Sequence, residues 1–300
     1  MSAALPDAFY HLSLTPTQIQ LLESLTPFRF RRVPCTSSPS SEPFLEPSLP
    51  LAAPPDVPYA LLLTPFRPTD VPAQVAVLNH PAVAFNLVGP PYPYRAEHAV
   101  ERFTAFGAET SRYWARVGEL AAKALEEHGS VEAAVEALSR EELPTEWLPS
   151  PEAIGSTIRR ADTDEMVGDM GVCRWNSEDE RDDEKRRKLV EENEKREVGD
   201  KDLVWSFGFF LAPSYHGQRL MSPLLHGLFS NLLKPFLRAE KICGAAFASN
   251  AGSLRTQEKN GLRRFGSWTR EISEARGGGT TEVVVLKWEK GSEEEEAKAV

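Results

Sequence analysis

One strand–turn–helix stretch constrains the fold more than any other part of this sequence. Its first part, Leu203–Leu211, is an apolar and aromatic run whose length and composition predict a strand. A turn with Pro213 and Gly217 follows, and apolar residues then recur at helical spacing from Met221 to Phe236. This layout aims backbone N–H groups and a helix N-terminus at one point, which is typical of a site for an anion such as a nucleotide pyrophosphate.

Shorter periodic segments surround this stretch. Apolar runs predict strands at Tyr59–Leu63, Ala153–Arg159, Met166–Trp175, Ile242–Ala248, Phe265–Ile272 and Thr281–Trp288. Apolar residues at helical spacing predict helices at Thr15–Leu25, 70–78, Arg95–Phe106, Tyr113–His128 and Val131–Leu138, with one more ending near Asn260. The helices between residues 113 and 138 are expected to form an inserted hairpin.

Composition divides the chain into one domain and several less regular segments. We expect an N-terminal proline-rich extension at 1–58, a domain at 59–290 with insertions at 107–150 and 176–201, and a charged tail at 291–300. Within the extension, Ser37–Pro58 is rich in proline and is interpreted as a connector. Residues 176–201 are almost entirely charged, which favours a solvated surface segment, helical or disordered, over a partner-binding arm.

Charge and cysteine usage limit the classes of function. The net charge of −10 argues against general nucleic-acid binding, since phosphate contacts need clustered Lys and Arg. Cys35, Cys173 and Cys243 show neither metal-ligand spacing nor a paired framework, which suits a reducing compartment. No apolar run approaches the ~18 residues of a membrane helix. We therefore expect a cytoplasmic protein with no metal, no nucleic-acid partner and no membrane partner.

Two motifs in the right order carry a resemblance to a known family. The first is Pro-x-Tyr-His-Gly-x-x-Leu-Met at Pro213–Met221, between a strand and a helix. The second, about thirty residues on, is Ser-Asn-x-x-Ser at Ser249–Ser253, again between a strand and a helix. Upstream stands Leu-Thr-Pro-Phe-Arg-Pro-Thr-Asp at Leu63–Asp70. Over Tyr59–Trp288 the chain resembles the GNAT superfamily of N-acetyltransferases, most of all the branch that includes the ribosomal-protein N-terminal acetyltransferases.

The resemblance implies a fold and a set of binding residues. The fold would be α+β, with a mixed, splayed sheet of six to seven strands flanked by helices, and it would bind acetyl-CoA. The strand end would offer backbone groups to the pantetheine arm, and the turn would hold the pyrophosphate. Asn250 would fix the pantetheine or the end of the next strand, and Ser253 would lie near the thioester sulfur. The implied acetyl-CoA-binding residues are Phe210, Leu211, His216, Gly217, Gln218, Arg219, Leu220, Met221, Asn250 and Ser253.

Arg219 departs from the family pattern. Family members usually have a second small residue there, giving Gly-x-Gly, because glycine lets the backbone approach a phosphate closely. The arginine side chain either obstructs the phosphate or turns outward and pairs with it. A non-catalytic module that binds CoA weakly or not at all, and works as an interaction or sensor domain, is therefore an alternative to an acetyltransferase.

Acetyl transfer to an amine needs a neutral amine, donors for the oxyanion and a proton for the thiolate. A protein α-amino group, with a pKa of about 7.7–8.0, asks less of a base than a lysine near ~10.4. The strand Leu203–Leu211 carries no ionisable side chain, so Asp169 is the first candidate base and His98 the second. Ser253 is the first candidate proton donor and Tyr215 the second.

Simpler roles and other acceptors stay open. Asn250 and Ser253 could serve only to cap the following helix, and Asp169 could be a solvated strand residue. The acceptor is expected to be a protein N-terminus. A small-molecule amine is the alternative, and the helical insertion would then wall off a closed pocket. The oligomeric state is not predicted.

Overall fold

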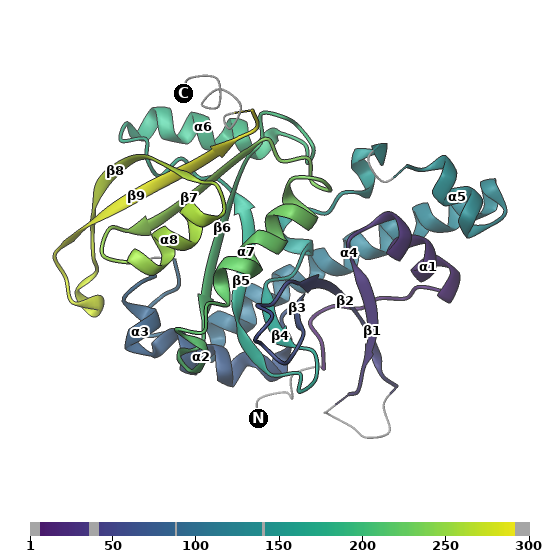
Figure 1. Cartoon of the computed structure of the whole chain (residues 1–300), viewed down its shortest axis with the longest axis horizontal. Helices are drawn as coiled ribbons and strands as arrows, with labels where there is room; N and C mark the ends of the chain where they lie inside the picture. The colour runs from purple at the N-terminus through teal and green to yellow at the C-terminus, as the bar shows by residue number, and fades with distance from the viewer. Residues whose placement is uncertain (1–6, 36–41, 88, 140–141, 292–300) are drawn as a thin grey trace.

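A nine-stranded sheet organises the computed structural model, which describes residues 7–35, 42–87, 89–139 and 142–291 (Figure 1). The strand order is β1-β2-β3-β4-β5-β6-β7-β9-β8. The strands are β1 Arg29–Val33, β2 Phe44–Leu51, β3 Leu61–Thr64, β4 Thr157–Arg160, β5 Met166–Arg174, β6 Val204–Leu211, β7 Lys241–Phe247, β8 Arg263–Glu271 and β9 Thr280–Glu289. The helices are α1 Pro16–Leu25, α2 Val71–Asn79, α3 Pro81–Ala84, α4 Ala96–His128, α5 Val131–Ala137, α6 Asp183–Lys195, α7 Met221–Leu228 and α8 Ala251–Lys259.

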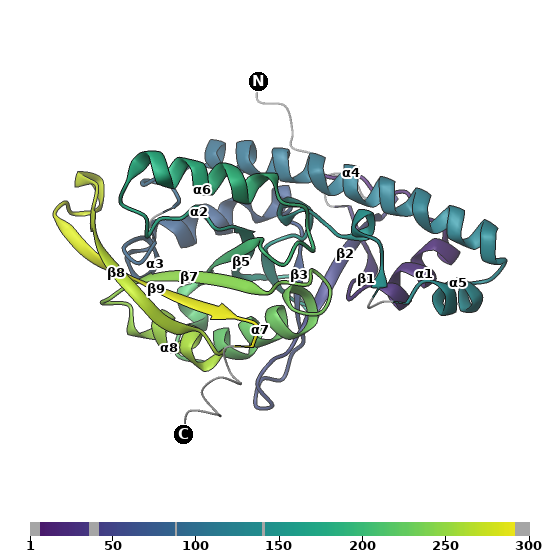
Figure 2. The same cartoon turned by 90° about the horizontal axis from the view of Figure 1, so that it is seen from above.

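Helices cover both faces of this sheet. Figure 2 shows α2, α4 and α6 on one side and α7 and α8 on the other. The helix α7 continues into a single π-helical turn, Phe229–Leu233, whose residues Phe229, Leu232 and Leu233 are buried. The predicted α+β class with flanking helices is therefore confirmed.

The sheet opens between β6 and β7, its only parallel neighbours among the described strands. Only Val204–Ser206 of β6 pairs with Lys241–Cys243 of β7, although both strands continue well beyond these residues. Past Ser206 the facing edges of the two strands have no strand partner. The predicted mixed, splayed sheet is confirmed, and the opening creates the space described below.

The sheet has two strands more than the upper end of the prediction, and both come from the N-terminal extension. The predicted connector Ser37–Pro58 contains β2, which pairs with β1 and β3, so that interpretation was wrong for this segment. Its prolines suggested a connector, yet Leu49 and Leu51 are buried in the main core. Residues 36–41 lie outside the described part. The boundary at residue 59 and the other divisions stay predictions, and the tail lies outside the described residues from 292 on.

The helical region also differs from the expectation. The predicted helices Arg95–Phe106 and Tyr113–His128 are one helix, α4, of 33 residues. Gly107 lies inside it for a packing reason: a Cβ there would lie 2.2 Å from the carbonyl oxygen of Phe9. The hairpin with α5 does form, because Gly129 ends α4 in the left-handed conformation at φ 76°. Within 176–201 the helical alternative is correct, since α6 is present.

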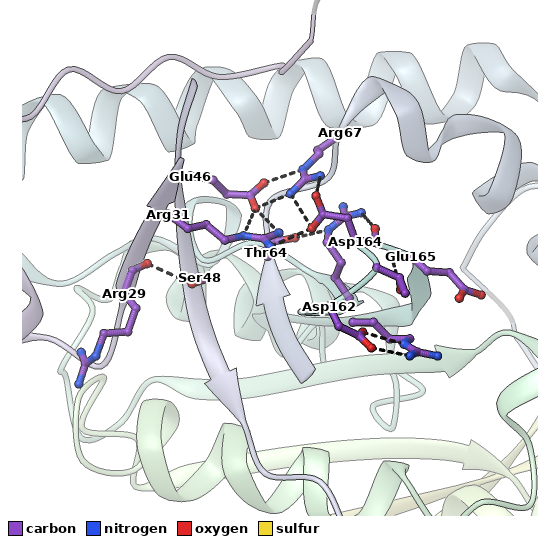
Figure 3. Close-up of polar contacts among 12 residues, drawn as sticks. Arg29, Arg31, Glu46, Ser48, Thr64, Arg67, Asp162, Asp164 and Glu165 are labelled. Atoms are coloured by element: carbon purple, nitrogen blue, oxygen red, sulfur yellow. Dashed lines mark hydrogen bonds and ion pairs between the residues drawn. The ribbon is translucent and has the colours of Figure 1, made fainter. Parts of the chain in front are cut away.

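A buried ionic network joins the N-terminal strands to the rest of the sheet (Figure 3). Glu46 on β2 has no exposed side-chain surface and accepts two hydrogen bonds from Arg67, at 2.8 and 2.7 Å. It also accepts hydrogen bonds from Tyr10 and Arg31, each at 2.8 Å. Asp164, on the turn between β4 and β5, pairs with the same two arginines at 2.8 and 3.0 Å. The network thus fastens β1 and β2 to the β4–β5 turn.

This network makes the stability of the protein depend on acidity. Burial opposes the charge of Glu46 and of Asp164, but the arginine hydrogen bonds and charges outweigh it and lower both pKa values. Their contribution is complete above the unfolded pKa values of about 4.3 and 3.9, and it is lost as the pH falls through the lower folded values. We expect the Tm difference between the natural protein and Glu46→Gln to be constant near pH 7 and to shrink below about pH 4. A Tm difference that stays constant between pH 7 and 3 would contradict this assignment.

Candidate active site

A cavity of about 1300 Å³ occupies the opening between β6 and β7. On one side of the sheet its walls come from the turn before α7 and from the first turns of α8. On the other side they come from α3 and from the segment that follows β5. The divergence of two parallel strands therefore produces a space that reaches both faces of the sheet.

Most of the predicted binding residues meet at this cavity. Those that line it are Phe210, Leu211, His216, Gly217, Arg219, Leu220, Met221, Asn250 and Ser253. Gln218 does not line it, and its amide donates a hydrogen bond to the carbonyl of Ser214 at 2.8 Å. Asp169 does not line it either.

The turn before α7 is held in a defined shape. A ring nitrogen of His216 lies 2.9 Å from the carbonyl oxygen of Leu211, which ties the turn to the end of β6. Gly217 and Arg219 both adopt left-handed conformations, at φ 75° and 57°. Arg219 thus takes a backbone conformation that glycine adopts readily and an arginine adopts at a cost of roughly 1–2 kcal/mol. The turn keeps a glycine-like shape while presenting a charged side chain.

Three cationic residues belong to the same cavity. Arg219, Arg255 and Lys259 line the cavity, and all three side chains are exposed. Within the described part of the chain none of these three side chains makes a hydrogen bond or an ion pair. In a chain with a net charge of −10, such a group favours a ligand with several negative charges. The sequence interpretation missed Arg255 and Lys259, although their i, i+4 spacing on the helix after Asn250 was a usable signal.

Replacing Arg219 separates its effect on the backbone strain of the turn from its effect on acetyl-CoA binding. In Arg219→Gly we expect the free energy of unfolding to rise by about 1 kcal/mol, since the left-handed strain is removed. We expect acetyl-CoA affinity to fall about tenfold, as for the loss of one charge-assisted hydrogen bond. Arg219→Asn is the matched control, because asparagine tolerates the left-handed region without the charge. Stronger acetyl-CoA binding by both variants would show that Arg219 obstructs the site.

The first turn of α8 places a serine at the cavity. The Asn250 side chain accepts a hydrogen bond from the backbone N–H of Ser253 at 3.1 Å, so Asn250 caps the helix. Both residues also line the cavity, so capping and cavity contact coexist. The Ser253 Oγ accepts a hydrogen bond from the amide nitrogen of Gln257 at 3.2 Å. Its own proton donates to no other described residue.

Neither of the two candidate bases lines the cavity. Asp169 is 6% exposed and accepts a hydrogen bond from the Ser156 hydroxyl at 2.7 Å. Burial raises the pKa of its carboxyl, against the opposing charge of Arg102. It faces Phe210 across the β5–β6 ladder, one strand away from the cavity wall. His98, on α4, does not line the cavity and accepts a hydrogen bond from the backbone N–H of Arg95 at 3.1 Å.

Asp169→Asn tests the predicted base. Because the carboxyl does not line the cavity, we expect kcat to change by less than about threefold, well below the 10²–10⁴-fold typical of a general base. The same variant is expected to keep the hydrogen bond from Ser156, since asparagine retains an acceptor oxygen. A loss of 100-fold or more in kcat without a loss of Tm would restore Asp169 as the base.

Tyr215 does line the cavity, and burial raises the pKa of its hydroxyl. Hydrogen bonding to Glu165 also raises this pKa, while Arg160 opposes it. The phenol therefore stays protonated at neutral pH. Its partners lie on β4 and on the turn that follows β4, which ties Tyr215 to the sheet.

The far side of the cavity is largely apolar. Ala82, Val83, Leu87 and Trp175 line it, and Glu178 adds one carboxylate, which pairs with Arg270 at 3.3 Å. The β8–β9 hairpin contacts the chain next to this wall at Ala84 and at Pro90. There Arg276 donates hydrogen bonds to the carbonyl of Ala84, at 3.0 Å, and to that of Pro90. The sequence did not disclose this contact, which joins residues almost two hundred positions apart.

Two further properties concern metals and membranes. Among the described residues, no group of three or more His, Cys, Asp or Glu side chains is arranged to hold a metal ion. No helix in the same part of the chain is both long enough and apolar enough to cross a membrane.

Comparison with known proteins adds the family. No curated protein matches the chain. Similar solved structures include YncA from Salmonella typhimurium with acetyl-CoA, at 10% identity and a TM-score of 0.44, covering 78% of this chain and 94% of that one. RimJ from Mycobacterium smegmatis in complex with CoA-disulfide has 13% identity and a TM-score of 0.44, covering 81% and 87%. RimL, a ribosomal L7/L12 alpha-N-protein acetyltransferase in complex with coenzyme A, has 14% identity and a TM-score of 0.44, covering 79% and 98%.

The assignment to a family rests on a family model and not on these structures. The model described as "Acetyltransferase (GNAT) domain" matches residues 60–263, which is more than half of the chain. The match includes the diverging strands β6 and β7, the turn before α7 and the cap of α8. The predicted enzyme class, an acetyl-CoA-dependent acetyltransferase, is thereby confirmed, and the chain belongs to the GNAT family of acetyltransferases.

Proposed function

We propose that this protein transfers the acetyl group of acetyl-CoA to a primary amine, with a protein N-terminus as the first candidate acceptor. One observation carries the proposal: the cavity joins a cationic rim on one side of the sheet to an apolar wall on the other. Ser253 lines the same cavity. This arrangement suits a phosphate-bearing donor that enters from one side and an acceptor that enters from the other.

The donor half fits the chemistry of CoA. The left-handed turn at Gly217–Arg219 and the N-terminus of α7 suit the pyrophosphate, and Arg219, Arg255 and Lys259 supply positive charge for the phosphates. Beyond Ser206, the β6 edge facing β7 has no strand partner, so its N–H and C=O groups are available to the pantetheine amides. Arg219 adopts the left-handed conformation that a glycine would adopt there, which supports a binding site over a degenerate one.

The chemistry requires little from a base. The neutral amine nitrogen attacks the thioester carbon, the C–S bond breaks, and its electron pair leaves on the sulfur. The nitrogen loses one proton and the sulfur gains one, so acetylated amine and CoA-SH result. An α-amino group with a pKa of about 7.7–8.0 supplies a useful neutral fraction at pH 7. We assign to Ser253, which lines the cavity, the donation of a hydrogen bond to the sulfur as negative charge develops there.

A small-molecule amine is the second candidate acceptor. The hydrogen bonds of Arg276 to Ala84 and Pro90 favour it, since they hold the β8–β9 hairpin against the segment beside α3. A wall fixed in this way leaves less room for an extended peptide. The three cysteines form no disulfide, and we propose a cytoplasmic location on that basis.

A panel of acceptors tests the proposal. CoA release would be measured with peptides that have a free N-terminus, with the same peptides blocked by N-acetylation, and with small primary amines. We expect turnover with free N-termini and none with the blocked peptides, even where these contain lysine. Turnover with small amines alone would identify the second candidate. Turnover with blocked lysine peptides would contradict the proposed preference for a weakly basic amine.

A further inference from the structure

A buried glutamine beside the predicted proton donor has no explanation in the binding role described so far. Gln257 is 1% exposed and lies on α8, one helical turn after Ser253. A Cβ on Gly244 of β7 would lie 2.2 Å from the Gln257 side-chain oxygen and 2.9 Å from the Phe207 ring. The amide is therefore pressed against β7 just beyond the point where β6 and β7 separate.

One end of this amide makes no hydrogen bond. The side-chain oxygen of Gln257 is buried and has no partner among the described residues. A buried carbonyl left in this state costs about 1–3 kcal/mol. A methionine has nearly the same length and volume and would avoid the penalty. Packing alone therefore does not account for an amide at this position.

The other end of the amide contacts Ser253. The Gln257 nitrogen donates to the Ser253 Oγ at 3.2 Å, and Gln257 also lines the cavity. An amide N–H only donates, so this contact occupies an acceptor position of the hydroxyl and leaves its proton free to point elsewhere. The backbone N–H of Ser253 is held separately by Asn250. The serine is thus fixed at both its backbone and its hydroxyl.

From this geometry we infer that Gln257 is a positioning residue that makes Ser253 a hydrogen-bond donor to the sulfur of CoA. The inference rests on the proposed function. As the C–S bond breaks and the electron pair moves to sulfur, the directed hydroxyl stabilises the forming thiolate. The amine proton released in the same reaction then neutralises it. Without the amide, the Ser253 hydroxyl can rotate to other acceptors, such as the backbone carbonyl of Ser249 or Asn250 just before α8.

Calorimetry of CoA binding tests the inference without turnover. Titration in buffers of different ionisation enthalpy counts the protons released on binding, and desulfo-CoA, which lacks the thiol, is the reference ligand. At pH 8, a hydrogen bond from Ser253 favours the bound thiolate, so CoA should release more protons than desulfo-CoA. We expect this excess to disappear in Ser253→Ala and to fall at least by half in Gln257→Met.

A second variant reverses the direction of the hydrogen bond. In Gln257→Glu, the ionised carboxylate can only accept, so the serine proton should turn toward it. We expect no excess proton release, and kcat about tenfold lower at pH 8 with the KM for acetyl-CoA within about twofold. The ratio of variant to natural kcat should recover as the pH falls, because a neutral carboxylic acid can donate again.

The outcomes separate the inference from the function on which it rests. If Ser253→Ala removes the excess while both folded Gln257 variants keep it, the inference is wrong and the proposed function stands. A kcat that is lower in the double variant Ser253→Ala/Gln257→Met than in Ser253→Ala alone would also overturn the inference. The amide would then act independently of Ser253. If the natural protein binds neither ligand at millimolar concentration, the proposed function fails and the inference fails with it.

Discussion

Replacing Glu46 with glutamine is expected to lower the free energy of unfolding by about 3 kcal/mol, the lower end of the range for breaking a buried ion pair. The carboxylate has no exposed surface and accepts hydrogen bonds from Arg67, Arg31 and Tyr10. Glutamine keeps the shape but removes the charge, so Arg31 and Arg67 lose the buried one of the two carboxylates that they share, and only Asp164 remains. Urea unfolding followed by circular dichroism measures the change.

A matched substitution nearby shows whether the burial of Glu46 causes the loss of unfolding free energy. Asp162 pairs with Arg160 on the turn after β4, and about half of its side chain is exposed. Asp162→Asn is therefore expected to change stability far less than Glu46→Gln, because exposed pairs contribute little. Equal losses in the two variants would mean that the network does not fasten the N-terminal strands to the sheet.

Ser253→Ala is expected to lower kcat about 100-fold, with the KM for acetyl-CoA within about twofold. The alanine cannot donate a hydrogen bond to the leaving sulfur. The helix cap survives, because Asn250 binds the backbone N–H of residue 253 and not its hydroxyl. Steady-state assays of CoA release with both substrates varied give the two constants.

An exposed serine on the edge strand β8 provides the control. Ser267→Ala removes a hydroxyl that does not line the cavity, so both constants should stay at their natural values. A rise in KM for acetyl-CoA with kcat unchanged in Ser253→Ala would assign Ser253 to donor binding alone. That result would remove it from the chemical step.

The strand, turn and helix from Leu203 to Leu228 could be read from the sequence, because local pattern determines each of them. The same holds for β7 and the cap at Asn250. Strand β2 could not, since its prolines have the composition of a connector and its place depends on pairing with β1 and β3. The continuity of α4 could not be predicted either. Gly107 suggests a helix end, and the reason for a glycine there, its close approach to Phe9, appears only in the structure.

The candidate site shows the same division between local and distant information. Most of the predicted turn residues line the cavity together, because they are contiguous in the sequence. Asp169 was chosen as a base by elimination, but its hydrogen bond to Ser156 of the preceding segment and its place opposite Phe210 follow from sheet register. Gln257 was missed because its contact with Gly244 joins a helix to a strand. The left-handed conformation of Arg219 likewise appears only in the folded turn.

The central claim is that the cavity between β6 and β7 binds acetyl-CoA through the turn at Gly217–Arg219 and the cations of α8. Calorimetric titration of acetyl-CoA into the natural protein and into Arg255→Ala/Lys259→Ala tests it most directly. We expect saturable one-to-one binding by the natural protein and binding at least tenfold weaker in the double variant, with a smaller dependence on salt. Absence of binding at millimolar acetyl-CoA, or equal affinity in the two proteins, would contradict the claim.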